Sequence, residues 1–334
     1  MKESLFYEKR GDGKVDCNLC ARYCKGIADG STGFCGIRKN VGGKLYSLVY
    51  GKACSLALDP IEKKPLFHFA PGTECLSMAT VGCNFRCRHC QNWEISQEYG
   101  KIGGEDISPE QIVEAAKARG AKGIAYTYTE PTIFYEYAYD TMKLAKKAGL
   151  YNVWVSNGYT APHAIKHASR YLDAVNVDVK GNEDFYRHIC MAPGLQPVLD
   201  ALLEYKKRKV WTEITTLVIP GYNDNEKDIR GIAKWICDNL GPDVPLHFSA
   251  FYPAYKLTGV PPTPVKTLEK CYKIAKREGL KWVYLGNVHS DKESTYCPKC
   301  GQIIIERSGY NTIYYGDRCP KCGTRIPIAG KKWL

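Results

Sequence analysis

The sequence has no long apolar run and no stretch of low complexity. None of its segments approaches the ~18 consecutive apolar residues that a membrane-spanning helix needs. Residues 1–16 are charged and contain no apolar core of the kind found in secretory signals. An internal repeat of domain size is also missing. These absences exclude membrane-spanning, fibrous and disordered chains, and they predict a soluble globular protein of the cytoplasm.

Acidic residues are in short supply. The 334 residues contain 35 Asp and Glu against 47 Lys and Arg, so the formal net charge is +12. This balance alone suggests a polyanionic partner. Metals bound by thiolates would change this net charge. Two divalent ions, each held by four thiolates, contribute −2 apiece, and a 2+ iron-sulfur cluster on three thiolates contributes −1, so the net charge becomes about +7. We therefore expect no nucleic-acid partner.

Cysteine, by contrast, is abundant. The chain has 16 Cys, and eleven of them fall into three tight groups. In a reducing compartment such groups bind metal rather than form disulfides. We name them the N-terminal cysteine group (Cys17, Cys20, Cys24, Cys35), the central cysteine group (Cys83, Cys87, Cys90) and the C-terminal cysteine group (Cys297, Cys300, Cys319, Cys322).

Short β-rich segments alternate with helical ones after residue 73. Such alternation predicts a parallel sheet with right-handed crossovers. We expect an α/β fold, a partial (β/α)6-type TIM barrel at 74–290, preceded by a Cys-rich metal-binding lobe at 1–73 and followed by a tail like a zinc ribbon or rubredoxin at 291–334. The predicted strands are 75–80, 123–129, 152–156, 174–179, 210–219, 246–251 and 282–285, with a further strand at 44–49. The predicted helices are 109–119, 133–148, 162–171, 197–208, 226–240 and 265–278.

The central cysteine group has the spacing Cys-x3-Cys-x2-Cys and directly follows the first predicted barrel strand. Three thiolates on one loop can hold three corners of a 4Fe-4S cube and leave the fourth iron open to a ligand. In a barrel of this class, chemistry takes place at the carboxyl ends of the strands, which is where this loop lies. Incidental thiols or part of a zinc site would be the alternative, but the spacing and position favour the cluster.

This spacing and position resemble those of the radical S-adenosylmethionine (SAM) enzymes. The segment Cys87–Trp93, together with Asp178-Val179-Lys180, is similar to the activating enzymes of glycyl-radical enzymes, such as pyruvate formate-lyase activating enzymes. Nearly the whole chain resembles the radical SAM enzymes of the AmmeMemoRadiSam system. That resemblance is carried by Asp59–Phe69, Tyr126–Thr132, Tyr284–Asn287 and the C-terminal Cys-Pro-Lys-Cys-Gly repeats.

The resemblance implies a mechanism and its partners. The open iron of a 4Fe-4S cluster would chelate SAM, and the cluster, reduced by a low-potential electron donor, would cleave it to a 5′-deoxyadenosyl radical that abstracts hydrogen. The substrate expected from the activating enzymes is a protein or peptide, with a glycine Cα as one candidate position. Modification of RNA or of a small molecule is the alternative within the superfamily. A non-catalytic scaffold with several zinc ions, or a nucleic-acid-binding protein, is the alternative from another class.

Polar residues at the predicted strand ends suit SAM. Ser156 and Asn157 can bond its carboxylate or ribose, Lys180 can face the carboxylate, and Asp178 can accept from a ribose hydroxyl or join a cation site. A salt bridge between Asp178 and Lys180 without ligand contact is the simpler alternative. His89 occupies an aromatic position of the activating enzymes and is expected near adenine.

Glu130 is the candidate for the SAM ammonium. The activating enzymes lead us to expect Gly-Gly-Glu after the second strand, where this chain has Tyr128-Thr129-Glu130. The carboxylate is kept, but the close backbone approach that Gly allows is not assured. A structural ion pair is the alternative role for Glu130.

The two outer cysteine groups are predicted metal sites. In the C-terminal group, 18 residues separate Cys300 from Cys319, which is a zinc-ribbon spacing, although the ligands alone do not separate zinc from iron. The N-terminal group has a less regular spacing and suits zinc or an iron-sulfur cluster. Among the unclustered cysteines, Cys190 is the candidate for a thiol that faces substrate.

Overall fold

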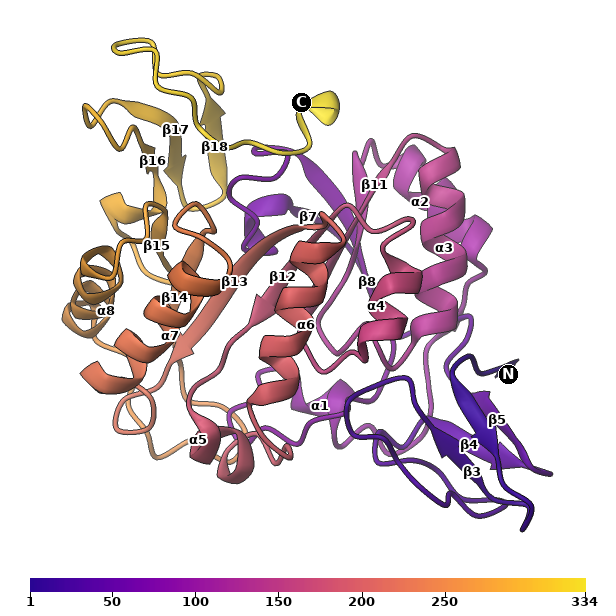
Figure 1. The fold of residues 1–334 in the computed structure, drawn as a ribbon. Coiled ribbons are helices and arrows are strands. Elements are labelled where there is room, and N and C mark those ends of the chain that lie inside the picture. Colours follow the sequence, from indigo (N-terminus) through magenta and orange to yellow (C-terminus); the bar gives the residue numbers. More distant parts are fainter.

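The core of the protein is an open eight-stranded sheet (Figure 1). The computed structural model describes residues 1–334, and none of its helices has the length and apolar character needed to cross a membrane. The strand order is β15-β14-β13-β12-β11-β10-β8-β7, and the two outermost strands do not pair with each other. Seven strands are parallel: β8 Glu74–Ala79, β10 Gly123–Tyr126, β11 Tyr151–Ser156, β12 Ala174–Asp178, β13 Trp211–Val218, β14 Leu246–Ala250 and β15 Val283–Gly286. The predicted partial α/β barrel is therefore confirmed.

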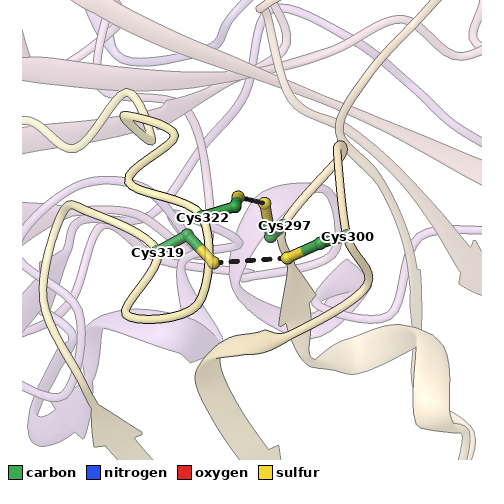
Figure 2. Close-up of side chains that lie close together, drawn as sticks. All are labelled: Cys297, Cys300, Cys319 and Cys322. Atoms are coloured by element: carbon green, nitrogen blue, oxygen red, sulfur yellow. Dashed lines mark hydrogen bonds between the residues drawn. The ribbon is translucent and has the colours of Figure 1, made fainter.

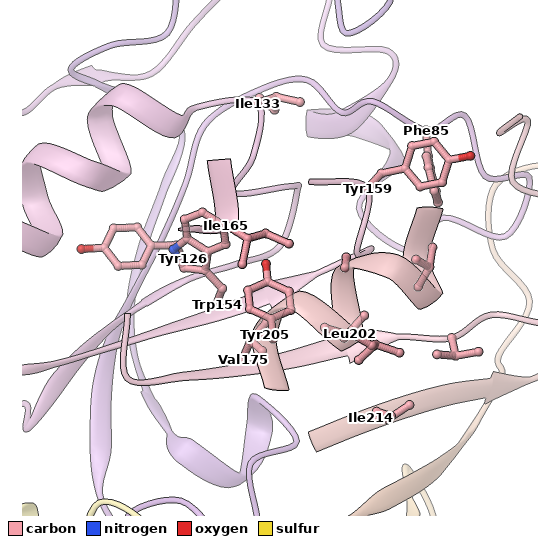
Figure 3. Packing of buried hydrophobic residues seen from close by; sticks show 14 of the residues in the cluster. Phe85, Tyr126, Ile133, Trp154, Tyr159, Ile165, Val175, Leu202, Tyr205 and Ile214 are labelled. Carbon is pink, nitrogen blue, oxygen red and sulfur yellow. The ribbon is translucent and has the colours of Figure 1, made fainter. Parts of the chain in front are cut away.

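Helices connect the parallel strands and cover the outer face of the sheet. The six predicted helices are α2 Pro109–Ala118, α3 Tyr135–Lys147, α4 Pro162–Ala168, α6 Gln196–Lys207, α7 Glu226–Asn239 and α8 Val265–Arg277. Local sequence explains their starts: Ser108 and Gln111 form a capping box before α2, and Asn225 caps α7. Their apolar faces join strand residues in a core of 66 buried residues, part of which is drawn in Figure 3. Two short helices, α1 Trp93–Ser96 and α5 Glu183–His188, were not predicted.

The N-terminal lobe is built from small antiparallel sheets. They comprise β1 Lys2–Glu3, β4 Arg38–Val41 and β5 Lys44–Ser47, the pair β2 Tyr7–Lys9 and β3 Val15–Cys17, and β6 Lys52–Ala53 paired with β9 Glu105–Asp106. The lobe shares the main core, because Val15, Ile37 and Leu45 are buried in the same set of 66 residues. A buried salt bridge of 2.6 Å joins Arg38 to Glu136 of α3, and both side chains are only 2% exposed. The lobe and the barrel therefore share one hydrophobic core.

One strand of the central sheet lies before the predicted boundary at residue 73. β7 Ser55–Pro60 pairs antiparallel with β8, and the short helix η1 Ile61–Lys63 begins the return between them. The division into 1–73, 74–290 and 291–334 remains a prediction.

The C-terminal tail packs along the open edge of the sheet. It contains β16 Thr295–Tyr296, β17 Ile303–Ser308 and β18 Asn311–Tyr314, with the short helices η2 Asp291–Glu293 and η3 Lys331–Trp333. Ile304, Ile305 and Ile326 form a small core with Phe67 and Trp282. In Figure 1 the lobe lies toward the same end of the sheet as α1 and α5, whereas most of the yellow tail lies toward the other end.

Candidate active site

The central cysteine group lies on the loop that follows β8. Gly82 turns this loop with a φ of +96°, which favours glycine. A Cβ at Gly82 would lie 2.9 Å from Ile37 Cγ2 and 3.1 Å from the carbonyl oxygen of Cys35, so glycine also permits a close approach of the N-terminal lobe. The Gly82 N–H donates to Ile95 O at 2.8 Å and thereby joins the two ends of the loop.

Hydrogen-bond donors surround the sulfur atoms of this group. The Phe85 N–H lies 3.4 Å from Cys83 Sγ, Asn157 Nδ2 lies 3.8 Å from the same sulfur, and Ser96 Oγ lies 3.2 Å from Cys90 Sγ. Burial raises the pKa of Cys83 and of Cys90. A metal must therefore displace protons to bind, and the N–H donors then stabilise the thiolates.

Cys190, the candidate for a thiol that faces substrate, lies against Cys87 of the central cysteine group, and its role toward substrate remains a prediction. Its side chain is fully buried, and its carbonyl accepts from Arg86 N at 3.1 Å. Contact with the Cys190 thiol, together with burial, raises the pKa of Cys87 well above its usual value. The unpredicted helix α5 delivers Cys190 to this place, because Phe185 O accepts the N–H of Cys190 at 3.1 Å.

Glu130 organises the ends of β10 and β11. Its carboxylate accepts from Thr132 N at 3.0 Å, from Ser156 Oγ at 3.0 Å and from Asn157 N at 2.8 Å. Burial raises the pKa of Glu130, and these hydrogen bonds oppose the rise. The structure thus brings three predicted SAM ligands together. Their contact with SAM remains a prediction. Glu130 is held by hydrogen bonds and does not form the structural ion pair that was its alternative role.

Tyr128 takes the backbone conformation expected of the glycine that it replaces. Its φ is +63°, in the left-handed region that is rare for a bulky side chain. Two contacts hold it there: Asn92 Nδ2 donates to Tyr128 O at 2.7 Å, and the Tyr128 hydroxyl donates to Asp59. The chain therefore keeps a glycine-like backbone conformation at Tyr128 at the expense of local strain, and the close approach to SAM remains a prediction.

Asp178 and Lys180 form the salt bridge that was the simpler alternative. Lys180 Nζ lies 2.7 Å from Asp178 Oδ2. Burial works to lower the pKa of Lys180, but the charge of Asp178 and the thiol of Cys87 outweigh it, and that pKa lies well above its usual value. Lys180 is therefore a fixed positive charge beside the central cysteine group. Whether either residue contacts SAM remains untested.

His89 carries an unpartnered polar atom. The side chain is 4% exposed, and its Nδ1 has no hydrogen-bond partner. Burial, together with the charge of Lys180, lowers the pKa of His89 to about 3, so the ring is neutral at physiological pH. A buried unpaired nitrogen beside three thiols fits a bound ligand that supplies the missing hydrogen bond. The residues present thus fit an iron-sulfur cluster with SAM.

The C-terminal cysteine group has the geometry of a single-ion site. Its four sulfur atoms all lie within 4.8 Å of one another, with Cys297 and Cys322 3.5 Å apart and Cys300 and Cys319 3.4 Å apart (Figure 2). Thiolates 2.3 Å from one tetrahedral ion stand about 3.8 Å apart, which is close to these values. A hydrogen bond from Thr324 lowers the pKa of Cys322 to about 6, which favours thiolate binding. The identity of the metal remains a prediction.

A cavity of about 610 Å³ opens beside the unpaired edges of the sheet. It lies between the segment after β7 and the end of β15, and its wall includes Thr215, Ser249, Asn287 and, from the tail, Tyr310. Thr215 pairs in register with Asp178, so the cavity reaches the level of the Asp178–Lys180 pair. A second cavity, of about 630 Å³, lies at the amino ends of the strands, away from the central cysteine group.

Comparison with known proteins agrees with this site. Residues 78–236 match the model of the radical SAM superfamily. An uncharacterised protein of Methanocaldococcus jannaschii is 50% identical over 98% of this chain and 99% of its own length. Pyruvate formate-lyase 1-activating enzyme of Escherichia coli K12 is 24% identical over 61% of this chain and 89% of its own length. The structure of Streptococcus suis SuiB bound to S-adenosylmethionine has a TM-score of 0.51 at 10% identity, over 71% of this chain and 56% of that one, which shows a shared fold alone.

The class defined by the fold and the three-cysteine loop is that of enzymes that use a 4Fe-4S cluster and SAM. The chain belongs to the radical SAM superfamily and is similar to pyruvate formate-lyase activating enzymes. Membership implies iron-sulfur and SAM binding and a need for an electron donor.

Several residues at this site were not found from the sequence. Asn84 accepts from Asn157 Nδ2 at 2.7 Å and so joins the cysteine loop to β11. Arg86 donates to the carbonyl oxygens of Cys83 and Phe34, both at 2.7 Å. These residues act through contacts between distant segments. The only sequence signal was their position next to the cysteines.

Proposed function

We propose that the protein removes a hydrogen atom from a protein or peptide substrate, as a radical SAM enzyme similar to the activating enzymes. The observation that carries the proposal is the cavity of about 610 Å³ between the two unpaired sheet edges, at the level of the Asp178–Lys180 pair. The volume of this cavity, beside Tyr310 of the tail, leaves room for a short segment of another chain. The Escherichia coli relative, pyruvate formate-lyase 1-activating enzyme, is named for its action on another enzyme, which supports the same substrate class.

The roles of the chain's own residues follow from their positions. Cys83, Cys87 and Cys90 would hold the cluster, which with SAM supplies one-electron reductive cleavage of the sulfonium. Lys180 would face the SAM carboxylate, and neutral His89 would offer its free Nδ1 to the adenine. The unpartnered, buried Thr215 hydroxyl lies in the wall of the cavity and would orient the substrate.

The two alternatives remain open to test. RNA or a small molecule could also enter the cavity, but no basic tract lines it, and Lys63 is its only lysine or arginine. A multi-zinc scaffold would need a single-ion geometry at the central cysteine group. Only the C-terminal group brings its sulfur atoms within 4.8 Å of one another.

The test uses reduced, anaerobic protein with SAM and a lysate of the source cells separated by mass. We expect 5′-deoxyadenosine formation to depend on a high-mass, protease-sensitive fraction. Lysate from cells fed glycine deuterated at Cα would then transfer deuterium to 5′-deoxyadenosine if a glycine Cα is the target. Turnover that survives protease and passes through a small-pore filter would overturn the protein substrate. Loss of turnover on ribonuclease treatment would favour RNA.

A further inference from the structure

The N-terminal cysteine group encloses a small cavity. All four of its cysteines line this space, together with Arg22, Arg38, Asn84 and other residues of the lobe and the barrel. Backbone contacts fix the group from both sides: the Cys17 N–H donates to Cys24 O at 2.9 Å, and Cys20 forms a β-bridge with Thr160 of the barrel. The four thiols therefore belong to one site, although 17 residues lie between the first and the last.

The four thiols of the N-terminal group are not drawn together around a single-ion position. The cavity that remains between them measures about 10 Å³. Four sulfur atoms drawn to 2.3 Å from a single zinc ion would leave no such space. The same contrast holds within the chain, because only the C-terminal group has all its sulfur atoms within 4.8 Å of one another. The N-terminal group instead resembles the central group in its wider spacing.

Two buried donors without partners line the same cavity. Arg38 Nε and Asn84 Nδ2 have no hydrogen-bond partner, and both residues are at least 98% buried. An unpaired buried N–H is destabilising unless an unseen ligand accepts from it. Metal-bound thiolates are anionic acceptors for such donors, and an iron-sulfur cluster adds bridging sulfides as further acceptors.

The site touches the loop of the central cysteine group. Asn84, which lines the cavity, directly follows Cys83 in the chain. The Cys35 carbonyl oxygen lies 3.1 Å from the Cβ position of Gly82. Phe34 joins the two loops further, because its carbonyl accepts from Arg86 and the Arg22 guanidinium lies 3.4 Å from its ring centroid.

We infer that the N-terminal cysteine group holds a second [4Fe-4S] cluster, which passes single electrons to the cluster on the central group. The electron comes from a low-potential one-electron donor protein. The donor loses one electron and the N-terminal cluster gains it. The N-terminal cluster then returns to its oxidised state as the central cluster is reduced, and the central cluster gives that electron to SAM when the sulfonium bond breaks. The electron transfer rests on the proposed function, but the metal assignment does not.

The metal assignment is tested in a variant that cannot hold the catalytic cluster. Cys83, Cys87 and Cys90 are all replaced by alanine, and iron, acid-labile sulfide and zinc are measured after anaerobic reconstitution. We expect about four irons and four sulfides per chain to remain, as four thiolates hold in a [4Fe-4S] site. Further replacement of Cys17 and Cys20 by serine should remove them. Zinc in place of iron in the triple variant would overturn the assignment.

The transfer is tested by counting electrons in the wild-type protein. Both clusters are reduced, the reductant is removed, and SAM is added. Each cleavage consumes one electron, so two connected clusters should give two 5′-deoxyadenosine per chain, and the electron paramagnetic resonance signals of both reduced clusters should disappear. One 5′-deoxyadenosine with a persistent cluster signal would overturn the transfer. If the reduced wild type forms none at all, the proposed function fails, and the metal analysis still decides the second cluster.

Discussion

The two outer cysteine groups have equal numbers of thiols but different surroundings. The C-terminal group gathers its sulfur atoms within 4.8 Å in a tail whose small core of eight residues lies apart from the main core. The N-terminal group has Cys17 and Cys35 inside the main core of 66 residues, and it touches the catalytic loop. The difference shows that the number of ligands alone does not define a metal site. The separation of the sulfur atoms and the unpaired groups around them indicate what the site can hold.

The largest effect on activity is expected at the central cysteine group, which serves as the reference for the two outer groups. Cys87→Ala should abolish SAM cleavage, because two thiolates are too few to hold the catalytic cluster. The barrel should still fold, since Cys87 is one residue of a large core. The formation of 5′-deoxyadenosine is measured under reducing, anaerobic conditions, and circular dichroism checks that the variant is folded. Activity in a folded Cys87→Ala protein would contradict the assigned catalytic loop.

The second prediction concerns the attachment of the N-terminal lobe. Arg38→Ala leaves the Glu136 carboxylate buried without its cation, which should reduce the free energy of unfolding by about 3–5 kcal/mol. Because the lobe shares the main core, the variant should unfold in a single transition of the whole chain, at a lower denaturant concentration than the wild type. Arg38→Met combined with Glu136→Leu should cost less than the single change. A separate transition of the lobe, with the barrel unchanged, would show that lobe and barrel are independent.

The third prediction tests the carboxylate of Glu130. Glu130 is bonded to Thr132, which also lines the N-terminal cavity. Glu130→Gln keeps the size but removes the charge, so the free energy of SAM binding should weaken by about 1.5–3 kcal/mol. Calorimetry with SAM measures this, and zinc content serves as the control for the tail. Unchanged affinity would assign Glu130 a structural role only.

The smallest effect on the stability of the whole chain is expected from a substitution in the tail. Cys319→Ala removes one ligand of the C-terminal group, and the tail should then become locally unfolded, because its core is too small to be stable without the metal. Hydrogen exchange should rise in β17 and β18, while β8 and β10 to β14 stay protected. Loss of protection throughout the barrel would mean that the two outer groups do not differ in the proposed way.

The sequence was sufficient where a local pattern decides the structure. The parallel strands, their helices and the three-cysteine loop followed from apolar runs, turn residues and spacing, with ends that differ by a few residues. β7 was not predicted, because its pairing with β8 depends on the return through residues 61–73. The turn at α5 that places Cys190 beside Cys87 was also missed. Nor could spacing show that Cys35 meets Gly82, because that contact joins segments that only the folded chain brings together.

The contrast between the outer groups is decided by the metal and sulfide content of wild-type protein purified without oxygen. Two clusters and one single-ion site correspond to about eight irons, eight sulfides and one zinc per chain. Two zincs with about four irons would contradict the second cluster and make both outer groups single-ion sites. Zinc without sulfide would contradict the catalytic cluster as well.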